Sequence, residues 1–334
     1  MPELRQNIIT RDWVIIAKER ALRPNEFASR RPAPPPRPSF DPTCPFCPGN
    51  EKMTRKEIYR VSEGSHWQVR VIDNKYPALV PEGERVRSLS GVFRSMAAVG
   101  YHEVIVEHPR HDLHTALYSP AELGTVLKTY RARYHEIRKD PRVEAVIIFR
   151  NHGEAAGTSL PHPHAQLVAT PIVPSQIRAR VEEAVRYFDD TGECVFCRTL
   201  REELLSRERI VCATDYFVAF IPYAALSPFH MWIYPRRHVS SFDESLDGEL
   251  DDLAVNLRSV LLRLYHGLGN PDLNYSIRSL PLRDRQTDYF HWYLAIVPRV
   301  TRTAGFELGS GMFINSSLPE ESAKFLRSIK IPEA

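Results

Sequence analysis

The residues with the clearest chemical potential lie at positions 161–166, where the sequence reads PHPHAQ. Side chains alternate between the two faces of an extended backbone, so His162, His164 and Gln166 are expected to point the same way. Pro163 supports this geometry because proline disfavours the helical region for the residue before it. Neutral imidazole can attack phosphorus, and a carboxamide can donate hydrogen bonds to phosphoryl oxygens. We therefore predict that His164 is a nucleophile for phosphoryl or nucleotidyl transfer and that Gln166 assists it.

Cysteines and histidines form a second pattern, which indicates metal binding. Of the five cysteines, four form two Cys-x-x-Cys pairs, which in a cytosolic chain are more often metal or redox sites than disulfides. The 13 histidines favour metal. Cys₂His₂ is a usual composition of structural zinc sites, so we predict two such sites. The predicted zinc ligands are Cys44, Cys47, His111 and His162 in the first half, and Cys194, Cys197, His238 and His291 in the second half.

These ligand sets recur in register, which indicates an internal duplication. His111 and His162 are 51 positions apart, and His238 and His291 are 53 positions apart. His108 and His114 are alternatives to His111, and His230 is an alternative to His238. We chose the histidines that are in register between the halves. Ordinary surface or core histidines are the alternative interpretation.

The two halves differ at the positions expected to do chemistry. When His291 is aligned with His162, Tyr293 falls opposite His164 and Ala295 falls opposite Gln166. The second half thus keeps the predicted metal ligand and lacks both the second histidine and the glutamine. This asymmetry favours a catalytic first half and a supporting second half. The alternative is that His164 is a buried histidine held only by hydrogen bonds.

Periodicity predicts the elements that position these residues. The length of 334 residues fits two domains, which we place at 1–175 and 176–334. The predicted strands cover 67–72, 101–107, 143–149, 217–222, 230–235, 275–280 and 291–298. The predicted helices cover 120–139, 174–188, 245–268 and 319–329.

Composition limits the classes of function. Hydrophobic residues make up 43% of the chain and charged residues 25%, as in soluble globular proteins. The net charge of +3 is too small to indicate binding to nucleic acid or to a membrane surface. No apolar run reaches membrane-spanning length, and the first residues do not form a signal peptide. We expect a cytoplasmic protein.

The motif His-Pro-His-x-Gln at 162–166 resembles the signature of galactose-1-phosphate uridylyltransferases, the transferase branch of the histidine-triad superfamily. Residues 7–24, 71–79 and 305–307 are similar to other segments of that family, so the resemblance covers nearly the whole chain. It implies an α+β fold, a duplicated histidine-triad-like architecture with two antiparallel-sheet half-barrel domains and packed helices. It also implies a ping-pong reaction through a nucleotidyl-histidine at His164. The residues that the resemblance assigns to substrate binding are Arg20, Arg23, Asn74, Asn151, Gly157, Ser159 and Glu307.

Two departures from the family pattern leave the nucleotide base and the acceptor open. Ala165 stands where the well-known uridylyltransferases have glycine. The second Cys₂His₂ set differs from the carboxylate-and-histidine metal site of the enterobacterial enzymes. It is similar to the branch that contains plant ADP-glucose phosphorylase. For this second set, iron stays open as the alternative to zinc.

The expected function is transfer of UMP between a UDP-hexose and hexose 1-phosphate, which would be the ligands of the protein. The first alternative is an ADP-glucose phosphorylase, which transfers adenylyl to phosphate. The second is a non-catalytic protein that binds zinc or nucleotides. A homodimer is expected from the resemblance alone.

Overall fold

The computed structural model describes residues 1–17, 37–284 and 286–332. Its largest element is a ten-stranded sheet with the order β10-β11-β12-β14-β13-β8-β9-β7-β4-β3, in which all neighbouring strands are antiparallel. The strands of the first half are β3 (Glu57–Glu63), β4 (His66–Asp73), β7 (Tyr101–Val106), β8 (Ala145–His152) and β9 (His164–Thr170). Those of the second half are β10 (Ile210–Ala213), β11 (Phe217–Phe220), β12 (Met231–Pro235), β13 (Leu273–Arg278) and β14 (Tyr293–Pro298).

The two halves meet at the pairing of β8 with β13. Asn151 of β8 lies opposite Asn274 of β13, and Phe149 lies opposite Ser276. Each half therefore contributes five strands to one continuous sheet. The predicted α+β class with antiparallel sheets is confirmed, and the sequence did not reveal that the sheets of the two halves join edge to edge.

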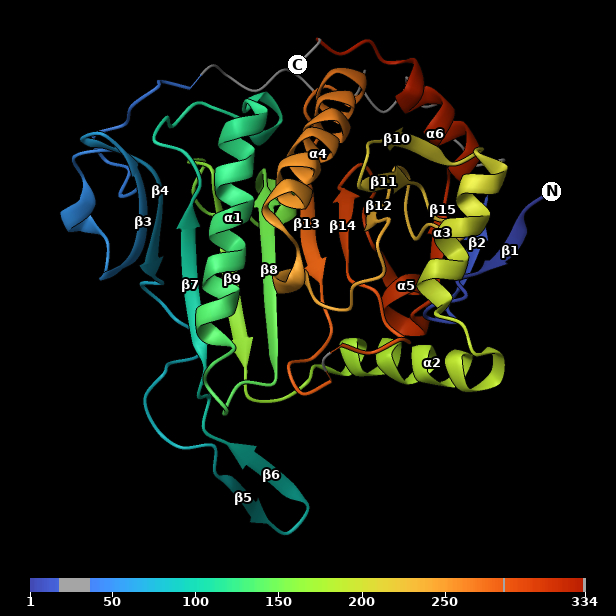
Figure 1. Ribbon diagram of the computed structural model, residues 1–334, viewed down its shortest axis with the longest axis horizontal. Helices are drawn as coiled ribbons and strands as arrows, with labels where there is room; N and C mark the ends of the chain where they lie inside the picture. Colours follow the sequence, from blue (N-terminus) through green and yellow to red (C-terminus); the bar gives the residue numbers. More distant parts are fainter. Residues whose placement is uncertain (18–36, 285, 333–334) are drawn as a thin grey trace.

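Two long helices, α1 (Pro120–Ile137) and α4 (Asp247–Leu268), lie side by side across one face of this sheet (Figure 1). The other helices are α2 (Ser175–Thr191), α3 (Val195–Ser206), α5 (Gly305–Ser310) and α6 (Pro319–Ser328), with 3₁₀ turns η3 (Glu51–Met53), η4 (Thr115–Leu117), η5 (Glu154–Ala156) and η6 (Phe242–Glu244). The four predicted helices all form, and their ends shift by a few residues. The helices α3 and α5 were not predicted.

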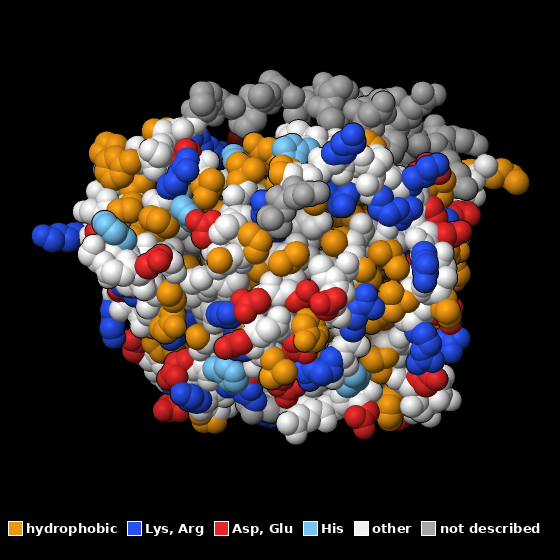
Figure 2. Space-filling model, turned by 45° about the horizontal axis from the view of Figure 1, so that its top comes forward, with side chains coloured by type: hydrophobic (Ala, Val, Ile, Leu, Met, Phe, Trp, Pro, Cys, Tyr) orange, Lys and Arg blue, Asp and Glu red, His pale blue; other side chains and the backbone are white. Residues whose placement is uncertain are grey.

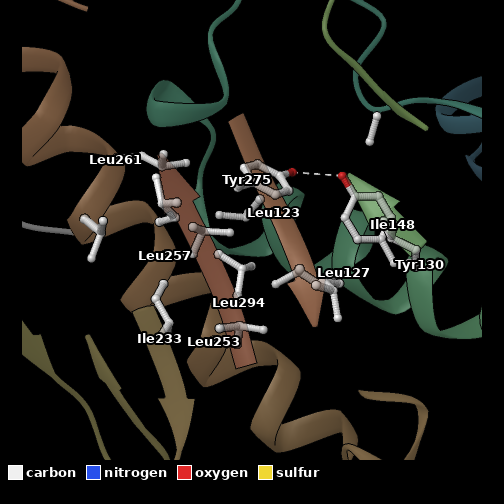
Figure 3. Packing of buried hydrophobic residues seen from close by; sticks show 14 of the residues in the cluster. Leu123, Leu127, Tyr130, Ile148, Ile233, Leu253, Leu257, Leu261, Tyr275 and Leu294 are labelled. Carbon is white, nitrogen blue, oxygen red and sulfur yellow. Dashed lines mark hydrogen bonds between the residues drawn. The ribbon is translucent and has the colours of Figure 1, made fainter. Parts of the chain in front are cut away.

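The start of α1 follows from its sequence. Ser119 accepts a hydrogen bond from the backbone N–H of Glu122, the Glu122 carboxylate accepts one from the backbone N–H of Ser119, and Pro120 occupies the first turn. This capping box satisfies donors that a helix start leaves free. The buried face of α1 packs with that of α4 and with the central strands in the main hydrophobic core (Figure 3). This core covers one face of the sheet, and smaller apolar clusters lie on the opposite face, around Val104 and Val106 in the first half and around Trp232 and Tyr293 in the second.

Two small sheets lie outside the large one. One contains β1 (Glu3–Gln6), β2 (Trp13–Ile16) and β15 (Phe313–Asn315), so an N-terminal hairpin pairs there with a strand from late in the chain. The other is a hairpin of β5 (Arg87–Ser90) and β6 (Phe93–Met96) that projects away from the body (Figure 1). These strands have three or four residues each, too few for a periodic pattern to stand out.

Charges of both signs are interspersed on the face drawn in Figure 2. That distribution agrees with the small net charge of +3 and differs from the clustered lysines and arginines of a nucleic-acid-binding face. Among the helices of the described residues, none has the length and apolar content needed to cross a membrane.

Candidate functional site

Strand β9 presents His164 and Gln166 on the face of the sheet opposite α1 and α4. Ala165 and Leu167 of the same strand belong to the core beneath those helices. Since side chains alternate along a strand, His164 and Gln166 must face the other way. The neighbouring strand β7 fixes their register, with Val106 opposite His164 and Val104 opposite Gln166.

The hydrogen bond of the His164 ring determines which nitrogen can react. Nδ1 lies 2.8 Å from the carbonyl oxygen of His162, and a carbonyl can only accept, so Nδ1 carries the proton. Nε2 therefore keeps its lone pair, and it has no hydrogen-bond partner within residues 1–17, 37–284 and 286–332. Burial lowers the pKa of His164 to about 4, so the ring is neutral at pH 7. A neutral imidazole with a free Nε2 is the form that attacks phosphorus.

The first Cys/His set gathers at the start of β9. Ligand atoms of Cys44, Cys47, His111 and His162 all lie within 4.8 Å of one another, and all four residues are buried. The sulfur-to-Nδ1 distances are 3.5 Å for Cys47 to His111, and 3.7 Å from His162 to each cysteine. Tetrahedral zinc with ordinary bond lengths places sulfur and nitrogen ligands about 3.6 Å apart. The spacing therefore fits zinc.

The hydrogen bonds around the first Cys/His set also fit a bound metal. Nε2 of His162 donates to the carbonyl of His108 at 2.8 Å, which leaves the Nδ1 lone pair directed at the thiols. The N–H of Asp41 points at the sulfur of Cys47 at 3.3 Å. Burial raises the pKa of the Cys44 thiol to about 11, so a thiolate there needs a nearby cation.

The second set is less compact. Ligand atoms of Cys194, Cys197 and His238 lie within 4.8 Å of one another. His291 is outside that group, although its Nδ1 lies 3.4 Å from the sulfur of Cys197. Nε2 of His238 donates to the carbonyl of Thr287 at 2.9 Å and leaves Nδ1 free for a metal.

This second Cys-x-x-Cys lies at the start of a helix. Cys194 immediately precedes α3, and Cys197 lies in the first turn of that helix. The Cys-x-x-Cys pattern alone does not distinguish a tight turn between the two cysteines from the start of a helix. Spacing of the thiols by one helical turn still directs both toward one point.

The histidines that competed for the ligand positions have other contacts. Nε2 of His108 lies 3.1 Å from the Glu122 carboxylate, the ring of His114 packs against that of His152, and the ring of His230 packs against Trp232. The register between the two halves thus selected the histidines that the fold brings to the cysteines.

Three predicted substrate-binding residues lie near the catalytic strand or in the loop before it. Asn151 is the second-last residue of β8, and its Oδ1 accepts a hydrogen bond of 2.8 Å from Nδ2 of Asn274. Gly157 has φ +86°, a left-handed conformation that favours glycine. A Cβ at this position would lie 3.8 Å from Nδ2 of Asn151. Ser159 is exposed two residues later. Their role in binding stays a prediction.

The remaining predicted substrate residues are spread more widely. Asn74 directly follows β4 and contacts His102. Glu307 lies in α5, on the second-half side of the sheet (Figure 1), where its carboxylate accepts from the N–H of Ala304 at 2.9 Å. Arg20 and Arg23 lie outside the described residues.

Sequence reasoning missed a buried ionic cluster beside β9. Glu107 is 1% exposed and accepts hydrogen bonds from Tyr130 and from Arg150, and Tyr275 lies 3.2 Å from the same carboxylate. Arg150 also donates to the carbonyl of His164 at 3.3 Å. The sequence carries no local signal for this cluster, because its residues come from segments that are far apart along the chain.

The structure thus holds a buried histidine, His164, beside a Cys₂His₂ group on an antiparallel α+β scaffold. The sequence model described as "Galactose-1-phosphate uridyl transferase, N-terminal domain" matches residues 1–174, and that of the C-terminal domain matches residues 180–311. The chain therefore belongs to the galactose-1-phosphate uridyl transferase family, whose members are nucleotidyltransferases.

Relatives of two kinds resemble the chain over almost its full length. ADP-glucose phosphorylase of Arabidopsis thaliana is 35% identical over 336 residues, which cover 99% of this chain and 93% of the relative. Galactose-1-phosphate uridylyltransferase of Thermotoga maritima is 27% identical over 341 residues, which cover 99% of each. A crystal structure of the Arabidopsis ADP-glucose phosphorylase with bound ADP-glucose superimposes with a TM-score of 0.85 at 32% identity and covers 99% of this chain and 100% of that one.

Proposed function

We propose that this protein transfers UMP between a UDP-hexose and hexose 1-phosphate, through a nucleotidyl group held on His164. The observation that carries the proposal is the state of His164. Its Nδ1 proton is donated to the carbonyl of His162, its ring is buried and neutral, and its Nε2 has no hydrogen-bond partner among the described residues. A histidine held only for structure would be expected to use both ring nitrogens.

The reaction has two displacements at one phosphorus. Nε2 of His164 forms a bond to the α-phosphorus of the nucleotide sugar, and the bond from that phosphorus to the bridging oxygen breaks. Hexose 1-phosphate leaves with the electron pair and requires no proton, because its phosphate oxygen is a weak base. The phosphate oxygen of the acceptor then attacks the same phosphorus, and the phosphorus–nitrogen bond breaks.

Gln166 assists both displacements by donating amide hydrogen bonds to the phosphoryl oxygens, whose charge increases in the transition state. Its carboxamide has no proton to transfer at neutral pH, so it acts by electrostatics alone. The other residues proposed to surround the phosphates and the nucleotide are Arg20, Arg23, Asn74, Asn151, Gly157, Ser159 and Glu307.

Both Cys/His sets are proposed to hold zinc, with iron as the alternative at the second. The ligands in the first are Cys44, Cys47, His111 and His162, and those in the second are Cys194, Cys197, His238 and His291. When bound, zinc supplies a structural cross-link. His162 would then be fixed from two sides, by the metal ligation of its Nδ1 and by the carbonyl that receives its Nε2 proton. Its own carbonyl orients His164, so the position of the nucleophile depends on the first set.

A second candidate, ADP-glucose phosphorolysis, is supported by the 35% identity to the Arabidopsis ADP-glucose phosphorylase and by the two Cys/His groups. It uses the same nucleophile with adenylyl in place of uridylyl, and phosphate in place of hexose 1-phosphate. The chemistry at His164 is unchanged. The two candidates differ only in the base pocket and in the acceptor.

One experiment tests both. The protein is incubated with UDP-glucose or ADP-glucose labelled at the α-phosphorus, and the modified residue is located by mass spectrometry. Galactose 1-phosphate or inorganic phosphate is then added, and the product is identified. A uridylyl adduct discharged by galactose 1-phosphate supports the first candidate, and an adenylyl adduct discharged by phosphate supports the second. Absence of an adduct with both sugars, in metal-loaded protein, favours a non-catalytic zinc or nucleotide-binding protein.

The remaining proposals concern the setting of the enzyme. We propose a cytoplasmic homodimer without a nucleic-acid or membrane partner. We also propose the domain boundary between residues 175 and 176, which falls after the first residue of α2 (Ser175–Thr191).

A further inference from the structure

A histidine outside the predicted site contacts Gln166. His102 lies in β7, next to β9, and its Nε2 is 2.8 Å from Oε1 of Gln166. The register places Val104 opposite Gln166 and Val168 opposite His102. His102 and Gln166 are therefore diagonal neighbours on one face of the sheet, the face that also carries His164.

The second nitrogen of the His102 ring decides where its proton lies. The backbone N–H of Ala78 is 3.1 Å from Nδ1, and a backbone N–H can only donate, so Nδ1 carries a lone pair. The proton of the neutral ring is therefore on Nε2, which donates to Oε1 of Gln166. With the amide oxygen turned toward His102, the amide nitrogen of Gln166 must point away from it.

Asn74 lies on another side of His102. Its Oδ1 accepts the N–H of Tyr76 at 2.9 Å, and its Nδ2 is 3.0 Å from Nε2 of His102. Because that Nε2 carries the proton donated to Gln166, it has no lone pair for Asn74 to use. The short segment from Asn74 to Ala78 thus holds His102 by its Nδ1 and leaves the direction of the Nε2–H to Gln166.

We propose that His102 is a positioning residue for nucleotidyl transfer, which fixes the Gln166 amide with its N–H donors toward the transferring phosphoryl group. This inference rests on the proposed function. A glutamine amide turned by 180° would present its oxygen to the phosphoryl oxygens and would repel them. In that orientation the Nε2–H of His102 would meet the N–H₂ groups of both Gln166 and Asn74 and would lose its acceptor, so His102 opposes it. The bond to Ala78 prevents the ring from adopting the other tautomer.

The test compares His102→Leu, which removes the donor, with His102→Gln, whose side-chain amide nitrogen can replace the ring Nε2. Each is made alone and together with Gln166→Ala. The measured quantities are the single-turnover rate of adduct formation on His164 at saturating nucleotide sugar, and the apparent KM. Loss of one well-placed donor to a reacting oxyanion slows reactions by about 10²–10³-fold. Because mispositioning retains part of that donor's effect, His102→Leu is expected to slow the rate by about 10–100-fold with little change in KM.

Two further results are expected. His102→Gln restores most of the rate, and His102→Leu has no additional effect once Gln166 is alanine, because the two residues act as one unit. Metal content and thermal unfolding, measured for every variant, verify that the fold is retained. Equal rates for His102→Leu and His102→Gln, or rate losses that multiply in the double variant, would overturn the inference.

A measurement on the unaltered protein keeps the test independent of folding. The ¹⁵N shifts of the His102 ring, assigned by comparison with His102→Gln, are expected to show the Nε2–H tautomer, and the Nδ1–H tautomer would overturn the inference. If the unaltered protein forms no adduct with UDP-glucose or ADP-glucose, the proposed function fails and this inference fails with it. If the adduct forms normally and only the variant results disagree, the proposed function stands and the role of His102 does not.

Discussion

The buried Glu107–Arg150 pair provides the most demanding test of the structure. Glu107→Gln keeps the shape of the side chain and removes its charge, so the guanidinium of Arg150 remains buried without a counter-charge. The Arg150 side chain is 4% exposed, and burial lowers its pKa to about 10, so it is still protonated at neutral pH. Loss of one partner of a buried ion pair costs about 3–5 kcal/mol.

The lower end of that range is expected here. Arg150 retains its hydrogen bond to the carbonyl of His164 at 3.3 Å, which solvates part of the charge. The predicted loss of about 3 kcal/mol is large beside a total stability of about 5–15 kcal/mol. As a matched control, Tyr275→Phe removes one hydroxyl, 2.9 Å from that of Tyr130 (Figure 3), and should cost about 1 kcal/mol.

Urea unfolding followed by circular dichroism measures these differences. The double variant Glu107→Gln with Arg150→Met should recover part of the lost stability, because it removes the unpaired charge together with its partner. Stability of Glu107→Gln within about 0.5 kcal/mol of the unaltered protein would refute the reasoning, since that change is typical of an ordinary surface substitution. A double variant that recovers none of the lost stability would refute the reasoning as well.

Three further predictions concern the metal groups and one turn. Cys44→Ser should reduce bound metal, measured by elemental analysis, by about one ion per chain and should slow formation of the nucleotidyl-histidine, whereas Cys212→Ser, which alters a cysteine outside both groups, should change neither. Cys194→Ser should also remove about one ion and lower the unfolding temperature while it leaves adduct formation per folded molecule nearly unchanged; a matching loss of activity would contradict the assignment of the second half to support. Gly153→Ala, at φ +85°, would bring its Cβ to 2.1 Å from the carboxylate of Asp272 and should lower the unfolding temperature by several degrees, which a calorimetric scan would detect.

The sequence determined the chemistry of the site because that chemistry is encoded locally. Alternation along an extended segment is a property of the backbone, so it set His164 and Gln166 on one face before the fold was known. The register between the halves selected His111 and His238 as candidate ligands, and the fold brings both to the cysteine pairs, since a duplicated fold returns equivalent positions to equivalent places. The helix beginning at Pro120 was equally local, because its capping box lies within four residues.

Tertiary structure alone decided which distant residues meet. His102 became a neighbour of Gln166 only through the pairing of β7 with β9, and strand register has no local signature in either strand. Glu107, which directly follows β7, likewise meets Arg150 of β8 only in the folded chain. The joining of the two halves at β8 and β13 has the same cause. An alternating strand specifies which of its faces is buried, but it does not specify which strand lies beside it.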